Sequence, residues 1–480
     1  MSTLLSLGLL AAAVSPAAAF WRLPCKAPVV VERTDPIVQP GAVSRHVHTI
    51  MGGNGFKPSM NYNDTQASTC ASCTVIGDDS NYWVPTVYYR HEDGSFETVN
   101  QLGGATVYYL QRAPQGKEMK AFPEGFRMVA GDQYKRSGGD DVTTKAISYA
   151  CLDYNGPARP ETPNFPNYNC ANGLRAQVFF PSCWDGVNLD SPDHKSHVAY
   201  PEGMNSGKCP DTHPVHLISI FYEILWETNK FADKWYGNSQ PFVFSTGDPT
   251  GYGGHGDFLN GWDVPLLQQA INTCTADSGN VEDCAAFNLR PDKQAEGCTI
   301  PTVVDEPVFG KLDALPGCND VTPGPDPAPK PTDTCTKGAT NLSNGTASTG
   351  PSVDGWNYLG CGNDNYYNRA LTKANTASDD MSNEKCATFC EGKGHSIAGT
   401  QYGRECYCDD TLRDDAAPVP GVNGLCKMPC SGAADEMCGG YGTLSLFQKA
   451  GAKTTRSMSS EEVVVRRHAG WHASRARKAV

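Results

Sequence analysis

Residues 215–226 read VHLISIFYEILW, the longest of five runs in which β-branched and aromatic side chains recur with partial alternation. This composition is typical of β-strands, where alternate side chains pack against a core. The other four runs are YWVPTVYYR (82–90), ATVYYL (105–110), AISYACL (146–152) and RAQVFF (175–180). Together they predict a domain built mainly of β-strands.

Helical periodicity is scarce in the same part of the chain. The one amphipathic helix that we predict there covers residues 264–276, VPLLQQAINTCTA, with Asp263 as its N-cap. Turn residues are plentiful, since the chain holds 49 Gly and 34 Pro. Because helices do not alternate with strands, the pattern favours a β-sandwich or jelly-roll-like domain with long loops over a parallel α/β fold.

Changes in composition divide the chain into five parts. An apolar run followed by Ala17-Ala18-Ala19 predicts a signal peptide over residues 1–19, cleaved before Phe20. The further parts that we expect are a large domain (20–318), a Pro/Thr/Ser-rich linker (319–354), a small cysteine-rich domain (355–447) and a basic, disordered tail (448–480).

Cysteine usage and charge point to an extracellular protein. Twelve of the 20 cysteines lie between Cys25 and Cys335 and eight between Cys361 and Cys438, so each half can close its own disulfides. We expect the C-x-x-C pair of Cys70 and Cys73 to form disulfides, not a zinc site. Three N-x-[ST] sequons predict glycosylation of Asn63, Asn341 and Asn344.

The charge and hydropathy of the chain limit its partners. A formal net charge of −13 argues against nucleic acid, which needs a basic protein surface. After the signal peptide no apolar run approaches the ~20 residues of a membrane span, so we expect no membrane partner once the signal is removed. A neutral or cationic extracellular substrate fits the acidic chain better.

The small domain carries WNYLGC (356–361), EKCATFCEGKGHSIAGTQYGRECYC (384–408) and CKMPCSGAADEMCGGYGTLSLF (426–447). These motifs and the eight cysteines resemble the WSC domain, a module of fungal wall sensors and secreted enzymes. The resemblance implies a small α+β domain that binds glycan. A helix with cysteines four residues apart could attach to the strands through both. We expect disulfides from Cys361, Cys386, Cys390, Cys406, Cys408, Cys426, Cys430 and Cys438.

Aromatic side chains can stack on the apolar faces of sugar rings. The small domain offers six candidates, of which we expect two or three to be exposed binders and the rest to be core. We select five for carbohydrate binding and leave Tyr366 in the wider pool: Trp356, Tyr358, Tyr402, Tyr407 and Tyr441.

The large domain contains the motifs DPIVQPGAVSRHVHTIMGGN (35–54), YWVPTVY (82–88), FFPSCWDGVNLDSPDHKSHVAYP (179–201), CPDTHPVHLISI (209–220) and GGHGDFLNGWD (253–263). These motifs resemble a fungal and actinobacterial family of secreted proteins defined only as a domain of unknown function, DUF1996. The resemblance implies a fold and a secreted habit, without an activity.

Seven of the eight histidines before the linker fall in short clusters beside turn residues, where sites are usually built. Two of them, in the H-x-H of residues 46–48, would face the same side of a strand. We predict that several clusters converge in one cleft. The catalytic candidates are His46, His48, Asp185, His194, His197, His255 and Asp257.

Three chemistries remain open for such a cleft. A divalent metal could bind His46, His48 and a third ligand from His194, His197, His213 or His255, of which we select His213. A glycosidase would need two carboxylates from Asp185, Asp190, Asp193, Asp257 and Asp263. A lyase would need a His or Tyr base with Lys195, Arg45 or Arg175 to neutralise a uronate.

The plain alternative is that these polar side chains cap loops and satisfy buried backbone groups. Two functions follow from the whole pattern. One is a secreted enzyme that cleaves an extracellular or cell-wall polysaccharide, as a hydrolase or lyase, while the WSC-like domain binds glycan. The other is a non-catalytic glycan-binding protein of the cell wall or matrix.

Overall fold

The computed structural model describes residues 19–457 except residues 115, 301, 305, 331–337, 343–352, 365–368, 414–425, 427, 441–442 and 452–454. The described part is mainly β, with antiparallel sheets and short helices, as the strand-like runs predicted. The predicted signal peptide lies outside it apart from Ala19, and the first strand begins at Phe20.

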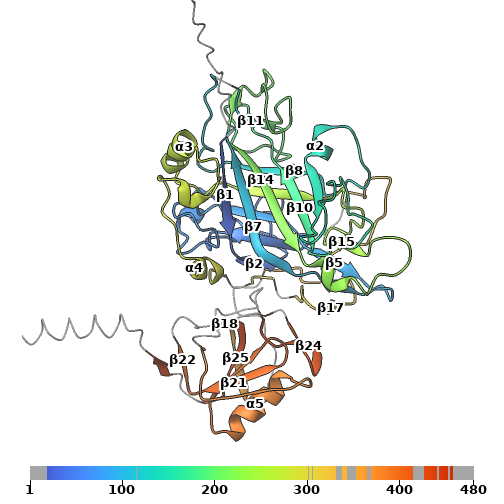
Figure 1. Cartoon of the computed structure of the whole chain (residues 1–480), viewed down its shortest axis with the longest axis vertical. Helices are drawn as coiled ribbons and strands as arrows, with labels where there is room; N and C mark the ends of the chain where they lie inside the picture. Colours follow the sequence, from blue (N-terminus) through green and yellow to red (C-terminus); the bar gives the residue numbers. More distant parts are fainter. Residues whose placement is uncertain are drawn as a thin grey trace, which may run out of the picture.

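The first large sheet has five antiparallel strands (Figure 1). Alternate side chains of its two central strands point to a shared core, including Tyr109 and Tyr222, which are fully buried. The order of the strands is β1 (Phe20–Cys25), β7 (Gln101–Leu110), β14 (Ser219–Trp226), β10 (Leu174–Phe179) and β9 (Ile147–Cys151).

The second large sheet packs against the first. Its strand β4 contributes Tyr82, whose ring lies 5.7 Å from that of Tyr222 and whose hydroxyl lies 2.8 Å from the hydroxyl of Tyr109. The large domain is therefore a β-sandwich. The strand order is β2 (Val30–Glu32), β3 (His48–Gly52), β4 (Asn81–Pro85), β16 (His255–Leu259) and β8 (Arg127–Gly131).

Two of the predicted strands each divide between two sheets. Residues 82–90 break after Pro85, which has no N–H for a ladder bond, so that β5 (Val87–Arg90) joins a separate four-stranded sheet. Residues 215–226 similarly yield a two-residue strand and β14. The four-stranded sheet has the order β15 (Phe242–Phe244), β5, β6 (Phe96–Thr98) and β17 (Lys311–Leu312). A three-stranded sheet has the order β12 (Val198–Ala199), β11 (Cys183–Trp184) and β13 (Val215–His216).

The outer face of the second sheet is buried as well. Its side chains Ile50, Trp83 and Val129 form a second apolar cluster with residues from the loops that cover them. The disulfide Cys70–Cys298 holds part of this cover in place. Every residue of β3, β4 and β16 is consequently buried, so groups on this face are shielded from bulk water.

The helices are short. The predicted helix is present as α3 (Val264–Thr273), and the Asp263 carboxylate caps it by accepting a 2.8 Å hydrogen bond from the N–H of Leu266. The remaining helices and 3₁₀ turns of the large domain are α1 (Tyr62–Gln66), α2 (Val142–Lys145), α4 (Asp292–Glu296), Thr228–Phe231 and Val281–Asp283.

The small domain is a five-stranded sheet with one helix, α5 (Asn383–Gly392), on one face. Cys386 and Cys390 of α5 bond to Cys406 and Cys408 of one strand, as the helical spacing suggested. Cys361–Cys426 and Cys430–Cys438 complete the four disulfides. The strand order is β18 (Trp356–Asn363), β25 (Thr443–Lys449), β20 (Ile397–Gln401), β21 (Glu405–Asp409) and β19 (Ala374–Ala377).

Short pairings complete the description of this end of the chain. They are β22 (Thr411–Arg413) with β26 (Thr455–Ser457), and β23 (Pro429–Cys430) with β24 (Ala433–Met437). Residues 455–457, within the part of the chain that we expected to be a disordered tail, pair as β26 with β22. Residues 458–480 lie outside the described part.

The first part of the expected linker contacts the large domain. The N–H of Ala328 donates to the carbonyl of Tyr134 at 2.8 Å, and the N–H of Thr322 donates to the carbonyl of Gly247 at 3.0 Å. Two predicted glycosylation sites, Asn63 and Asn341, are exposed, and Asn344 lies outside the described residues. Both members of the C-x-x-C pair are in disulfides, Cys25–Cys73 and Cys70–Cys298, as expected.

Asp79 gives the fold a predicted pH dependence. Burial, and then the charge of Asp78, raise its pKa to about 7. Between pH ~4 and ~7 the folded protein keeps this proton and the unfolded chain loses it, so stability falls as pH rises, by at most about 1.4 kcal/mol per pH unit. Asp79→Asn should remove this part of the slope in urea unfolding between pH 4.5 and 8. The exposed-site control Asp277→Asn should keep it, and an unchanged slope in Asp79→Asn would contradict the assignment.

Candidate functional site

One row of residues crosses the end of the second sheet on its outer face. The strand register pairs Glu32 with His48, His48 with Pro85, and His255 with Gly131. Extending the β4–β16 register by two residues places His255 opposite Pro85 as well. Because paired residues point to the same face, His48 and His255 flank a compact proline ring, and their own rings meet over it.

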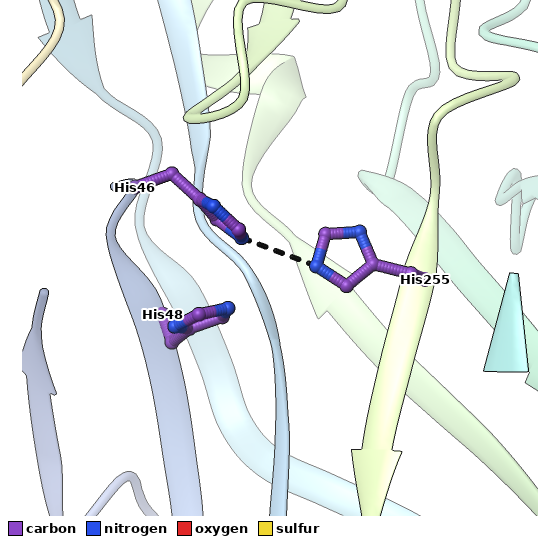
Figure 2. Close-up of side chains that lie close together, drawn as sticks. All are labelled: His46, His48 and His255. Carbon is purple, nitrogen blue, oxygen red and sulfur yellow. Dashed lines mark hydrogen bonds between the residues drawn. The ribbon is translucent and has the colours of Figure 1, made fainter. Parts of the chain in front are cut away.

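His46 completes a cluster of three imidazoles (Figure 2). It lies two residues before His48, and their ring centroids are 4.2 Å apart. The Nε2 atoms of His46 and His255 are 3.1 Å apart. The exposed fractions of His46, His48 and His255 are 4%, 0% and 4%. The two H-x-H histidines therefore do face the same side, and their third partner comes from a strand more than 200 residues later.

Backbone carbonyls fix the orientation of two rings. His48 Nδ1 lies 3.0 Å from the Thr34 carbonyl oxygen, and His255 Nδ1 lies 3.1 Å from the Gly253 carbonyl oxygen. A carbonyl only accepts hydrogen bonds, so each Nδ1 must carry the proton. The Nε2 atoms of His48 and His255 consequently present their lone pairs toward the cluster.

The cluster is held uncharged at neutral pH. Burial lowers the pKa of His48 and that of His255 to about 3, and it lowers the pKa of His46 well below its usual value, with further lowering from the charges of the other two histidines. Neutral imidazole is the form that serves as a metal ligand or as a general base. Because all three pKa values fall, none of these side chains acts as a charged acid at pH 7.

Two buried carboxyl groups stand beside the histidines. Asp257, two residues after His255 on β16, is buried, and burial together with the charge of Asp35 raises its pKa well above the usual value. Asp35 is also buried and interacts electrostatically with His255. Our sequence reasoning missed Asp35. Its signal was an aspartate turn, because its carboxylate accepts the N–H groups of Ile37 and Val38 at 3.0 Å.

Gly131 lets β8 approach His255 closely. Its φ is +86°, and an added Cβ would lie 2.3 Å from the Gly254 carbonyl oxygen and 2.8 Å from the His255 Cα. A side chain here would have to displace the start of β16. The absence of a side chain at residue 131 therefore helps to place the His255 ring over the row.

The structure corrects the choice of His213 as third metal ligand. Its ring nitrogens contact the Thr212 hydroxyl at 2.9 Å and the Ser196 carbonyl at 3.1 Å, and it does not belong to the three-histidine cluster. The loop before β13 holds it elsewhere, whereas His255 starts the strand next to β4. His255, one of the four alternatives, is the histidine that lies together with His46 and His48.

Two other catalytic candidates have structural partners of their own. The Asp185 carboxylate accepts the N–H groups of Val187 and Asn188, which closes a turn. Both nitrogens of His197 are in contact with other groups, Ser191 Oγ at 2.9 Å and the Arg127 carbonyl oxygen at 2.8 Å. These contacts fit loop capping. Neither residue belongs to the cluster of His46, His48 and His255.

His194 lies near the cluster without joining it. Its Nδ1 is 2.8 Å from Asp190 Oδ1, and its carbonyl accepts the N–H of Val129 at 3.0 Å, which places it along β8. The next residue, Lys195, donates to the Gly131 carbonyl and interacts electrostatically with His255. The loop of residues 190–197 therefore borders the histidine-bearing end of the sheet.

The aromatic candidates of the small domain differ in how much of each side chain is exposed to solvent. Trp356 is only 7% exposed and belongs to the core, which corrects its assignment as a binder. Tyr358 packs on Phe447 at 5.2 Å and is also largely covered. Tyr407 is half-buried with the guanidinium of Arg369 4.5 Å above its ring.

Tyr402 is the exposed candidate among the described residues, with 51% of its surface accessible. It lies in the tight turn between β20 and β21 with a φ of +53°, a left-handed conformation that is uncommon for residues other than glycine. Tyr441 and Tyr366 lie outside the described residues. Within the described part of the small domain, the ring of Tyr402 is thus the exposed candidate, and it lies on the turn between β20 and β21.

Comparison with known proteins gives both domains a family. Residues 35–262 match the model "Domain of unknown function (DUF1996)", and residues 358–440 match the model "WSC domain". The chain carries a DUF1996 domain followed by a WSC domain. The three histidines lie within the DUF1996 match and Tyr402 within the WSC match, whereas Trp356 precedes the latter.

Several relatives share short segments with this chain. A "WSC domain-containing protein" of Arthroderma benhamiae is 36% identical over 111 residues, which is 22% of this chain and 12% of the relative. "Xylosyltransferase oxt" of Drosophila melanogaster is 32% identical over 103 residues, 21% of this chain and 12% of the relative. "Kremen protein 2" of Homo sapiens is 32% identical over 94 residues, which is 19% of this chain and 20% of the relative. The chain thus spans at most a fifth of these relatives.

The family matches and the disulfides fit an extracellular or cell-wall protein. A WSC domain is of a carbohydrate-binding type, which agrees with the glycan partner expected for this chain. Disulfides close both the DUF1996 and WSC domains, as oxidising compartments permit. Among the described residues, no helix has the length and apolar character required to cross a membrane.

Proposed function

We propose that the protein binds polysaccharide outside the cell, at a wall or matrix, and that the WSC domain makes the contact. The observation that carries this proposal is the exposed ring of Tyr402 within the WSC match. Holding a non-glycine residue at a positive φ costs of order 1 kcal/mol, and such costs concentrate at functional positions. The ring is therefore the first candidate for stacking on a sugar.

Polar groups around the turn suit the hydroxyls of a neutral glycan. Arg404, next to the turn, is exposed, and Glu405 accepts a 2.9 Å hydrogen bond from the Tyr407 hydroxyl. Arg369 contacts both Asp364 and Gln401. Planar groups of this kind can donate to and accept from adjacent sugar hydroxyls while the aromatic ring covers the C–H face.

The test is co-sedimentation of the full chain with insoluble chitin, β-1,3-glucan and cellulose. We expect binding to at least one, and roughly tenfold weaker binding by Tyr402→Asn, which loses a stacking ring worth about 1.4 kcal/mol while keeping a residue that tolerates positive φ. The control Tyr154→Ala removes a ring that is 72% exposed on the large domain and should bind like the wild type. Binding that is equal in all three proteins would place the glycan contact elsewhere.

Cleavage of the bound polysaccharide by the large domain is a second candidate. It is favoured by the convergence of three neutral histidines from strands distant in sequence. Such a cluster can activate a water through a metal or abstract a proton directly. We expect reducing-end release that is lost in His48→Gln and retained in Tyr402→Asn at saturating soluble oligosaccharide. Absence of release from every bound polysaccharide would leave the non-catalytic binding function.

A further inference from the structure

The described part of the chain contains three groups of potential metal ligands. Within each group, the ligand atoms all lie within 4.8 Å of one another. Two consist largely of disulfide sulfurs: Cys183 and Cys209 with His216, and Cys386, Cys390 and Cys406. A disulfide sulfur is not a thiolate, so these groups offer no metal-binding set. In the group formed by His46, His48 and His255 no ligand atom belongs to a disulfide, and the Nε2 atom of His48 has no hydrogen-bond partner.

The hydrogen bonds to Thr34 and Gly253 prepare two of these histidines for a cation. Each fixes a proton on Nδ1 and leaves the Nε2 lone pair facing the partner rings. Metal-bound histidines usually donate their second N–H to a carbonyl or carboxylate in this way, which fixes the tautomer and raises the ligand's basicity. Figure 2 shows the three rings turned toward one another.

His48 supplies an independent sign that the cluster binds a cation. Its side chain is 0% exposed, and its Nε2 has no hydrogen-bond partner. Buried polar atoms without a partner are rare in folded proteins and call for an explanation such as an ion. Here the unpaired atom is an acceptor, and it points at the site where the other two imidazoles meet.

The spacing agrees with a common ion. For tetrahedral zinc with Zn–N distances of about 2.0–2.1 Å, two nitrogen ligands lie roughly 3.3 Å apart. His46 Nε2 and His255 Nε2 are 3.1 Å apart. At this distance His46 Nε2–H can donate a hydrogen bond to the His255 Nε2 lone pair, and a cation bound by both nitrogens would take the place of that proton.

We propose that His46, His48 and His255 bind one divalent transition-metal ion of the zinc class through three imidazole nitrogens. Neutral nitrogen donors favour zinc, copper or nickel over calcium and magnesium, which prefer oxygen. No described carboxylate oxygen lies within 4.8 Å of all three nitrogens, so the fourth position falls to water or another small ligand.

A polar cavity lies beside the residue that precedes His46. It is lined by Arg45, which directly precedes His46, and by Gln133, Tyr134, Asn319 and Asp320. Part of its wall is the linker segment that hydrogen-bonds to the large domain. The metal site is separate from the WSC turn, so the failure of either proposal leaves the other standing.

The test uses the full chain secreted from a eukaryotic host, stripped with dipicolinate, reloaded with zinc chloride and desalted. We expect about one zinc per chain by mass spectrometry of the metal. His48→Gln and His255→Gln should each hold less than about a tenth of that amount. His213→Gln, which changes a histidine outside the cluster, should hold as much as the wild type.

A second measurement guards against variants that merely misfold. Zinc should raise the Tm of the wild type and His213→Gln by several degrees and leave the Tm of His48→Gln unchanged, because only a protein that binds the ion in its folded state is stabilised by it. Near-ultraviolet circular dichroism establishes that each variant is folded. Less than about 0.2 zinc per chain in the reloaded wild type, or full loading of folded His48→Gln, would overturn the proposal.

Discussion

Removing the Cys70–Cys298 disulfide by Cys70→Ala/Cys298→Ala should lower the free energy of unfolding by about 5 kcal/mol. The bond closes the longest loop of the described disulfides, with a sequence separation of 228 residues. Opening it gives the unfolded chain most of the conformational freedom of that loop, and the effect grows with the logarithm of loop length. Both cysteines also pack in or against the apolar cluster on the outer face of the second sheet.

The loss should be visible in guanidinium unfolding followed by tryptophan fluorescence. The control is Cys274→Ala/Cys284→Ala, whose bond closes a separation of 10 residues and should cost roughly 3 kcal/mol less in the same chain-entropy model. Because the long disulfide holds the cover over the histidine-bearing face, the double variant should also lose zinc at a lower temperature than the wild type. Equal losses of stability for the two pairs would contradict the loop-length argument.

Trp83→Ala should lower the free energy of unfolding by about 3–5 kcal/mol. The indole is fully buried in the row next to the histidines, paired with Ile50 on one side and Asp257 on the other. It packs on Phe56 with ring centroids 5.6 Å apart. Truncation leaves a cavity in the row next to the cluster, and the flanking strands are held apart by the sheet, so they cannot close it by collapsing.

Trp83→Phe is the matched control. It keeps an aromatic ring and removes the indole Nε1, which has no hydrogen-bond partner in the described part of the chain. Its cost should therefore be less than half of that of Trp83→Ala. Urea unfolding with the DUF1996 domain's other tryptophans as the probe measures both. A smaller loss for Trp83→Ala than for Trp83→Phe would mean that the cavity does not control the stability of this face.

Local sequence patterns predicted those strands, helices and disulfides that depend on the spacing of nearby residues. The strand-like runs, the helix after Asp263 and the attachment of α5 by cysteines four residues apart all follow from periodicity and spacing. The H-x-H spacing also placed His46 and His48 on one side, because strand side chains alternate.

The third histidine depended on tertiary structure. His255 meets the other two because β4 lies between β3 and β16 and because Pro85 and Gly131 leave room in the row. A sheet order that pairs β4 with β16, where Asp257 lies opposite Trp83, has no local signature. The choice of His213 therefore failed, and Trp356 was likewise taken as a binder although the core of a small domain needs its large ring.

The central claim is that a metal ion joins the three histidines on the covered face of the second sheet. Diffraction from crystals of the zinc-loaded full chain, recorded on both sides of the zinc absorption edge, locates the ion directly. We predict one anomalous peak within about 2.0–2.1 Å of nitrogens of His46, His48 and His255. A peak elsewhere, such as between His194 and Asp190, or no peak in the loaded crystals, would contradict the account.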